Sequence, residues 1–274
     1  NMKAIDKLIN RIKELNNPTV IGLDPRYNLL PKCALEKYPN TLEGISNAII
    51  EYNKALIDET YDIIPAIKPQ IAFYEMFGID GMRAFEETCK YAKEKGMLVI
   101  ADIKRSDIGT TAQAYSNAYL GKTKIGDKEV SIFDVDFVTV NPYMGIDSIK
   151  PFIDDCKKYD KGLFILVKTS NPSSGELQDI KLENGEEVYI KVTKLVKEWG
   201  NDLIGENGYS SIAAVVGATY PKQLEEIRKL APSTYFLIPG YGAQGGKAED
   251  IAFGFDKKRF RWDCKRFKKF NVCI

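Results

Sequence analysis

The stretch VIADIKRSDIGTT, residues 99–111, decides how the rest of the chain is organised. An apolar run over residues 97–101 enters it, and its short, partly β-branched character predicts a buried strand. Asp102 and Lys104 follow two residues apart, a spacing that puts side chains on the same face of a strand. Asp107 lies just beyond, where the chain turns toward a helix. The pattern predicts two carboxylates and one ammonium group close together at the carboxyl end of a buried strand, with a solvated loop of incidental charges as the alternative.

Strand and helix patterns alternate along the whole chain. Short apolar segments without polar alternation are typical of a sheet that is buried on both faces, and repeated strand–helix units make such a sheet parallel. The predicted strands are 19–23, 63–67, 97–101, 137–140, 163–167, 212–216 and 235–238, and the predicted helices are 3–15, 41–59, 80–95, 110–119, 146–156, 188–199 and 221–230. Residues 120–134 form a polar insertion, and residues 171–186 are predicted to be a long loop that acts as a lid.

These units predict a single (β/α)₈ TIM barrel over residues 1–274, because seven strand–helix units are visible and barrels of this kind have roughly 250 residues. An eighth strand is not evident, so it is expected to be atypical or damaged. A doubly wound sheet is the alternative fold. No G-x-G-x-x-G motif follows the first strand, so nothing favours a dinucleotide-binding version of it.

Composition excludes several classes of function. The chain has 274 residues, of which 44% are hydrophobic and 28% charged, and a net charge of +1, which gives no electrostatic case for nucleic acid or a membrane as partner. No apolar run approaches the roughly 18 residues of a membrane-spanning helix, and the N-terminus has no signal-peptide pattern. The five cysteines form no C-x-x-C pair. We therefore expect reduced thiols and a cytoplasmic protein without a disulfide framework or zinc site.

The chain contains no histidine. This absence excludes Ser-His-Asp and Cys-His catalysis and any histidine-ligated metal. Proton transfer must then depend on Asp, Glu, Lys, Tyr or Cys side chains.

Polar residues follow nearly every predicted strand, and the carboxyl ends of barrel strands are where barrel enzymes place their chemistry. Taken singly, such a residue also fits an ordinary salt bridge at the barrel rim. Two lysines and two aspartates together favour a preorganised electrostatic site in which the charges keep one another ionised without a metal. The residues at the strand ends are Asp24, Lys68, Asp102 with Lys104, Asn141, Thr169, Thr219 and Gln244.

The segment 240–246 is rich in glycine and follows the seventh predicted strand. Glycines allow backbone N–H groups to approach an anion closely, and phosphate binding near the last strands recurs among barrels. We expect Gly242, Gln244, Gly245 and Gly246 to bind phosphate; a flexible loop is the alternative.

Several motifs together resemble orotidine 5′-phosphate decarboxylase, and in particular the longer branch of that family. The similarity extends over residues 19–246, although the D-x-K-x-x-D part alone is shared with a wider group of barrels. The motifs are D-x-K-x-x-D-I-x-x-T (Asp102, Lys104, Asp107, Ile108 and Thr111), Asp24, Lys68, V-N-P-Y-M-G at 140–145, K-T-S-N-P at 168–172 and P-G-x-G-A-Q-G-G at 239–246.

The resemblance implies loss of CO₂ from orotidine 5′-monophosphate to give UMP without cofactor or metal. Asp102 would face the substrate carboxylate, and Lys104 would stabilise the C6 carbanion and protonate it. Lys68 and Asp24 would orient the ribose and the charge network. Asp107 would act with them as a catalytic residue.

The resemblance also implies further contacts and a homodimer with shared active sites. Asp107 and Thr111 would reach into the partner's site, and Ile108 and Asn141 would contact substrate. Thr169 or Ser170 would hold the pyrimidine edge, and Gln244 would bridge base and phosphate.

The segment 257–274, KKRFRWDCKRFKKFNVCI, departs from the family pattern, which has a last strand followed by an arginine that binds the phosphate. It fits a basic tail, a nucleic-acid-binding arm, or an aberrant tail produced by a frameshift after about residue 258. A shifted frame is favoured because codon degeneracy then permits a glycine-rich turn, an apolar strand, a Ser-Arg pair and an apolar helix start. Resequencing the gene distinguishes these alternatives.

Two other functions compete with decarboxylation of this substrate. Mg²⁺-dependent sugar-phosphate lyases or decarboxylases share D-x-K-x-x-D, but they have an acidic metal ligand where this chain has Lys68. A barrel that binds a phosphorylated ligand without catalysis is the second alternative, kept open by the departure at residues 257–274.

Overall fold

The computed structural model describes residues 2–240 and 252–255. The predicted phosphate loop with Gly242, Gln244, Gly245 and Gly246, the expected eighth strand and the segment 257–274 lie outside the described residues.

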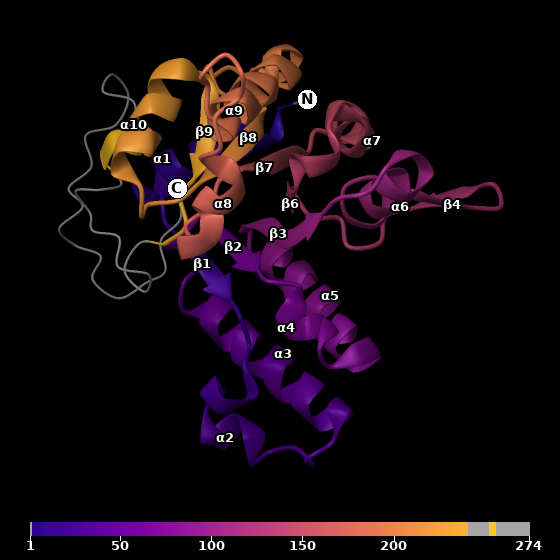
Figure 1. Ribbon diagram of the computed structural model, residues 1–274. Coiled ribbons are helices and arrows are strands. Elements are labelled where there is room, and N and C mark those ends of the chain that lie inside the picture. Colours follow the sequence, from indigo (N-terminus) through magenta and orange to yellow (C-terminus); the bar gives the residue numbers. More distant parts are fainter. Residues whose placement is uncertain (1, 241–251, 256–274) are drawn as a thin grey trace.

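A curved sheet of seven strands organises the chain (Figure 1). The strands pair in the order β1-β2-β3-β6-β7-β8-β9, and every pairing is parallel. In a doubly wound sheet the first strand lies inside and the order reverses, whereas here the spatial order follows the chain order, as in a barrel. The predicted TIM-barrel-like α/β fold is confirmed. The strands are β1 Val20–Leu23, β2 Ala66–Pro69, β3 Leu98–Arg105, β6 Phe137–Val140, β7 Gly162–Lys168, β8 Ser210–Val216 and β9 Thr234–Leu237.

Amphipathic helices connect the strands and cover the sheet (Figure 1). The long helices are α1 Ala4–Leu15, α3 Leu42–Asp58, α5 Gly78–Glu94, α6 Gly109–Tyr119, α7 Ile146–Tyr159, α9 Val188–Trp199 and α10 Pro221–Leu230. Short helical turns lie between them: η1 Tyr27–Leu29, α2 Lys32–Leu35, α4 Ala72–Glu75, η2 Pro142–Met144, η3 Pro172–Ser174, α8 Gly175–Gln178, η4 Asn201–Leu203 and η5 Ala252–Gly254. None of the helices in the described ranges has the length and apolarity needed to cross a bilayer.

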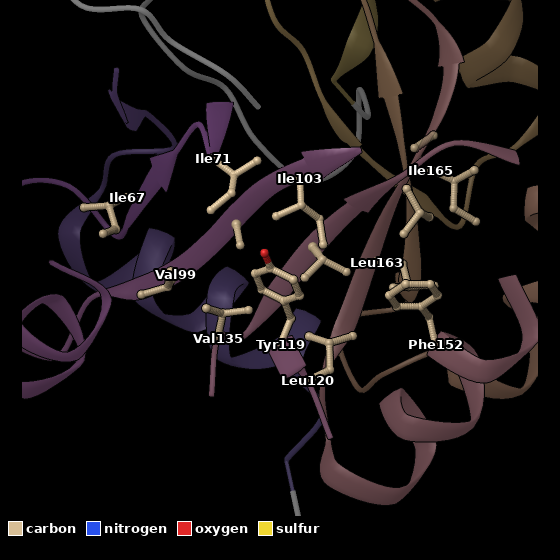
Figure 2. Packing of buried hydrophobic residues seen from close by; sticks show 14 of the residues in the cluster. Ile67, Ile71, Val99, Ile103, Tyr119, Leu120, Val135, Phe152, Leu163 and Ile165 are labelled. Carbon is tan, nitrogen blue, oxygen red and sulfur yellow. The ribbon is translucent and has the colours of Figure 1, made fainter. Parts of the chain in front are cut away.

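The strands bury both faces, which explains their continuous apolar character. Ile67, Val99 and Val138 belong to the cluster that packs under the surrounding helices, part of which Figure 2 shows. Their neighbours Ala66 and Leu98 belong instead to a second cluster with helix α1. Successive strand residues therefore enter two different cores, and α1 packs against the inner one.

Two strands, β2 and β3, differ from their predicted bounds by three residues or more. Strand β2 begins at Ala66 because Ile63 and Ile64 continue the turn after α3, with both N–H groups bonded to the Thr60 carbonyl at 2.9 and 2.8 Å. Lys68 therefore lies within β2 and not after it. Strand β3 continues past the predicted end at residue 101 as far as Arg105.

Two segments predicted as irregular contain secondary structure. The polar insertion includes an antiparallel hairpin, β4 Thr123–Ile125 and β5 Lys128–Val130, which projects beside α6 in Figure 1. Its turn includes Gly126 at φ +60°, a conformation that glycine adopts without strain. The first half of the predicted lid segment 171–186 contains η3 and α8, and its second half contains turns and an isolated bridge between Lys181 and Glu187.

Candidate active site

A buried carboxylate, Asp102 on β3, lies between two lysines. The Lys68 ammonium on β2 is 3.0 Å from Asp102 Oδ2, and the Lys104 ammonium is 2.5 Å from Oδ1. The side chains of Asp102 and Lys68 are 8% and 14% exposed, whereas that of Lys104 is 45% exposed. Lys104 is therefore the member of this charge cluster most open to a ligand.

The electrostatics keep Asp102 ionised. Burial alone would raise the pKa of Asp102, but the charges of Lys68 and Lys104 outweigh it and lower the pKa to about 2. Asp24, which follows β1, behaves differently. The residue as a whole is exposed, but burial of its carboxyl group raises its pKa, and the nearby charge of Lys68 opposes that rise only in part. The two carboxylates thus have pKa values displaced in opposite directions, an arrangement that often marks a functional site.

A bulge in β3 forms the site. Ala101 pairs with Val138 and Arg105 pairs with Val140, so residues 102–104 of β3 lie opposite the single residue Thr139 of β6. Lys104 lies in this bulge at φ 45°, a left-handed conformation that is rare for residues other than glycine. Asp102 and Lys104 meet as predicted, but through a bulge and not through regular strand alternation.

Thr139 is a site residue that was not predicted from the sequence. Its side chain donates a hydrogen bond to Asp102 Oδ1 at 2.8 Å and accepts one from the Lys104 backbone N–H at 3.0 Å. The one available signal was a hydroxyl residue within the otherwise apolar segment 137–140.

Thr169 and Ser170 follow β7, and Thr169 contacts the segment predicted as a lid. The Thr169 N–H donates to Gln178 Oε1 at 2.9 Å, and Gln178 Nε2 donates to the Thr169 hydroxyl at 2.8 Å. The carbonyl of Ser170 accepts a hydrogen bond from the hydroxyl of Thr219, another predicted strand-end residue, at 3.1 Å. The two hydrogen bonds between Thr169 and Gln178 attach the segment 171–186 to the end of β7, and the bond from Thr219 joins the ends of β7 and β8.

A partly buried ion pair between the end of β7 and the segment 171–186 was also not predicted from the sequence. The Lys168 side chain is fully buried, and its ammonium is 2.7 Å from Asp179 Oδ1. The same ammonium lies 4.5 Å from the centre of the Tyr220 ring, and the hydrogen bond from Lys168 lowers the pKa of Asp179.

Four other predicted site residues are not part of the charge cluster in the single chain. Asp107 Oδ1 accepts a hydrogen bond from the Ile108 N–H at 2.8 Å, and the ion pairs among the described residues do not include it. Ile108 and Thr111 are exposed at the start of α6. Asn141 Oδ1 accepts from the Tyr143 N–H at 3.0 Å and so caps η2. The structure brings Lys68, Asp102 and Lys104 together but leaves Asp107 apart.

A parallel α/β barrel with interleaved charges at the carboxyl ends of its strands is typical of barrel enzymes. Comparison with known proteins narrows this class. A sequence model of the "Orotidine 5'-phosphate decarboxylase / HUMPS family" matches residues 19–254. The chain belongs to this family.

Individual relatives agree with the family assignment. The orotidine 5'-phosphate decarboxylase of Caldicellulosiruptor bescii is 41% identical over 255 residues, 92% of this chain and 83% of the relative. That of Clostridium tetani is 44% identical over 248 residues, 90% and 81% of the two chains. The solved structure of Leishmania donovani OMP decarboxylase has a TM-score of 0.67 and 33% identity, and the alignment covers 88% of this chain and 81% of that one.

Proposed function

We propose that this chain decarboxylates orotidine 5'-monophosphate to UMP and CO₂, without a cofactor, in de novo pyrimidine biosynthesis. The observation that carries the proposal is the buried Asp102 carboxylate, held ionised between Lys68 and the more exposed Lys104. Membership of the family and the names of the relatives support the same activity.

The proposed chemistry uses the charge cluster directly. Asp102 lies beside the substrate carboxylate and repels it; the bond from C6 to the carboxylate breaks, CO₂ leaves and the electron pair stays on C6. The Lys104 ammonium stabilises this carbanion and transfers a proton to C6, and Lys104 then takes up a proton from solvent. Because the chain contains no histidine, the exposed Lys104 ammonium beside Asp102 is the group in this cluster that we assign as proton donor.

Other residues bind the remainder of the substrate in this proposal. Lys68 and Asp24 orient the ribose and the charged side chains of Asp102 and Lys104. The pyrimidine is held by Thr169 or Ser170 with contributions from Ile108 and Asn141, and the phosphate by Gln244 and the glycines 242, 245 and 246.

Turnover by the purified chain tests this function. We expect the absorbance of orotidine 5'-monophosphate to fall on addition of the protein, at a rate that EDTA does not change, because the Lys68 ammonium lies against Asp102 Oδ2 where a divalent cation would need an acidic ligand. Loss of activity in EDTA would favour a Mg²⁺-dependent enzyme of related fold. Binding of UMP without turnover would favour the barrel that only binds a phosphorylated ligand.

We further infer a cytoplasmic homodimer with shared active sites. Asp107 stays outside the charge cluster of its own chain, and exposed apolar side chains follow the neighbouring strands β3 and β6. Ile108 is 51% exposed and Tyr143 83% exposed. A second copy that covers these side chains would bring its Asp107 and Thr111 to the site.

Mixed dimers test the shared site. A purified heterodimer of Lys104→Ala and Asp107→Ala chains is expected to recover about half of the wild-type rate, because one of its two sites carries neither substitution. Each homodimer of the variants should be nearly inactive. No recovery in the heterodimer, or a monomer in sedimentation equilibrium at the enzyme concentration assayed, would contradict the shared site.

A further inference from the structure

Thr139 is a buried hydroxyl residue in an apolar strand. Thr139 is only 1% exposed. The other residues of β6 are apolar and fully buried: Phe137, Val138 and Val140. A hydroxyl in such a position lowers stability unless it is hydrogen-bonded. The hydrogen-bond partners of the Thr139 hydroxyl therefore indicate the role of this residue.

The bulge in β3 gives Thr139 its partners. The pairs Ala101–Val138 and Arg105–Val140 leave Thr139 alone opposite residues 102–104. The regular ladder is interrupted there, so the Lys104 N–H bonds to the Thr139 hydroxyl at 3.0 Å instead of to a strand carbonyl.

The same hydroxyl donates its hydrogen to Asp102 Oδ1 at 2.8 Å. This is the oxygen that also accepts from the Lys104 ammonium at 2.5 Å. One oxygen atom of Thr139 thus connects the carboxylate of Asp102 with the backbone of Lys104, and a hydroxyl can do both because it has one donor and two acceptor sites.

We propose that Thr139 is a positioning residue that holds Lys104 in its left-handed backbone conformation and aims the Lys104 ammonium and the Asp102 carboxylate at the substrate. The proposal rests on the proposed decarboxylation and adds to it a residue that does not touch the substrate. The strain of a non-glycine residue at φ 45° is sustained because the Thr139 hydroxyl replaces the missing ladder bond.

The hydroxyl also influences the charge of Asp102. Lys68 from β2 and Lys104 from β3 face this carboxylate, Thr139 faces it from β6, and the charge of Asp24 after β1 interacts with it. The hydrogen bond from Thr139 favours the ionised form and contributes to the lowered pKa of Asp102, after the larger effects of the two lysines.

Thr139→Val, which keeps the shape and removes the hydroxyl, tests the proposal. We expect kcat to fall about 10- to 100-fold while KM changes by less than about threefold. Loss of the hydrogen bond to the charged Asp102 would displace the reacting groups of Asp102 and Lys104, whereas the residues that bind the substrate would keep their contacts. Thr139→Ser, which keeps the hydroxyl, should stay within about threefold of wild type. A ¹³C NMR titration of the Asp102 carboxyl should give a higher pKa in Thr139→Val than in Thr139→Ser or wild type.

A matched control is Thr193→Val, at a residue that is 2% exposed and whose hydroxyl bonds to the Tyr189 carbonyl within α9. It should leave kcat unchanged. The proposal is overturned if Thr139→Val retains wild-type kcat and Asp102 titration, or if Thr139→Ser loses as much activity as Thr139→Val, which would indicate packing alone. If none of the chains decarboxylates the substrate, the proposed function fails, and the Asp102 titration alone decides the role of Thr139.

Discussion

Lys104→Ala is expected to reduce kcat for decarboxylation by at least about 10³-fold, since it removes both a proton donor and the charge that stabilises the carbanion. The geometry behind this expectation is the 2.5 Å contact between the Lys104 ammonium and Asp102 Oδ1, together with the 45% exposure of the Lys104 side chain. The rate is measured from the loss of substrate absorbance under saturating substrate.

Two controls separate the roles of Lys104. Lys104→Arg keeps a positive charge but gives up its proton far less readily, so it should restore part of the electrostatic effect and little of the proton transfer. Lys128→Ala, in the exposed hairpin, should leave the rate unchanged. Equal rates for Lys104→Ala and wild type would remove Lys104 from the proposed mechanism.

Asp179→Ala is expected to lower the free energy of unfolding by about 3 kcal/mol, the typical cost of leaving a buried charge without its partner. The Lys168 side chain is 0% exposed and would keep its contacts with the Tyr220 and Tyr189 rings but no carboxylate partner. Asp179 itself is 39% exposed, so the attraction between the two charges is partly screened and most of the cost comes from the dehydrated ammonium of Lys168. Urea denaturation followed by fluorescence measures the change.

The reverse substitution provides the control. Lys168→Met removes the buried ammonium and leaves a carboxylate that water can reach, so it should cost no more than about 1 kcal/mol. This asymmetry distinguishes a desolvated lysine from an ordinary surface ion pair, for which both substitutions would have small and similar effects. Equal losses in the two variants would contradict the interpretation.

Part of the site was predictable because its signals are local. Asp102 and Lys104 follow an apolar segment at a spacing of two residues, and the repeated strand–helix pattern places all the strand ends at one edge of the sheet. Lys68 was predicted at that edge for the same reason. The strand that carries Lys68 was nevertheless placed three residues too early, because Ile63 and Ile64 are as apolar as strand residues but continue the turn after α3.

Other features depend on partners far away in the sequence. The burial of Lys168 depends on Asp179, which follows α8, and on Tyr220, which precedes α10. A lysine after an apolar run has the same local pattern whether it is buried or exposed. The separation of Asp107 from the charge cluster depends on the path of the chain after β3.

Three features follow from the sequence alone: the parallel barrel, the edge that carries the charges, and the pairing of Asp102 with Lys104. The repeated strand–helix units determined the first two, and the stretch 99–111 determined the third. Periodicity and composition are enough for these conclusions, because they decide which faces of each element are buried. Only the tertiary structure decided that Thr139 links that pair and that Lys104 adopts a left-handed conformation. The register between β3 and β6 skips two residues at this point, and a bulge arises from contacts between strands, which no local pattern records.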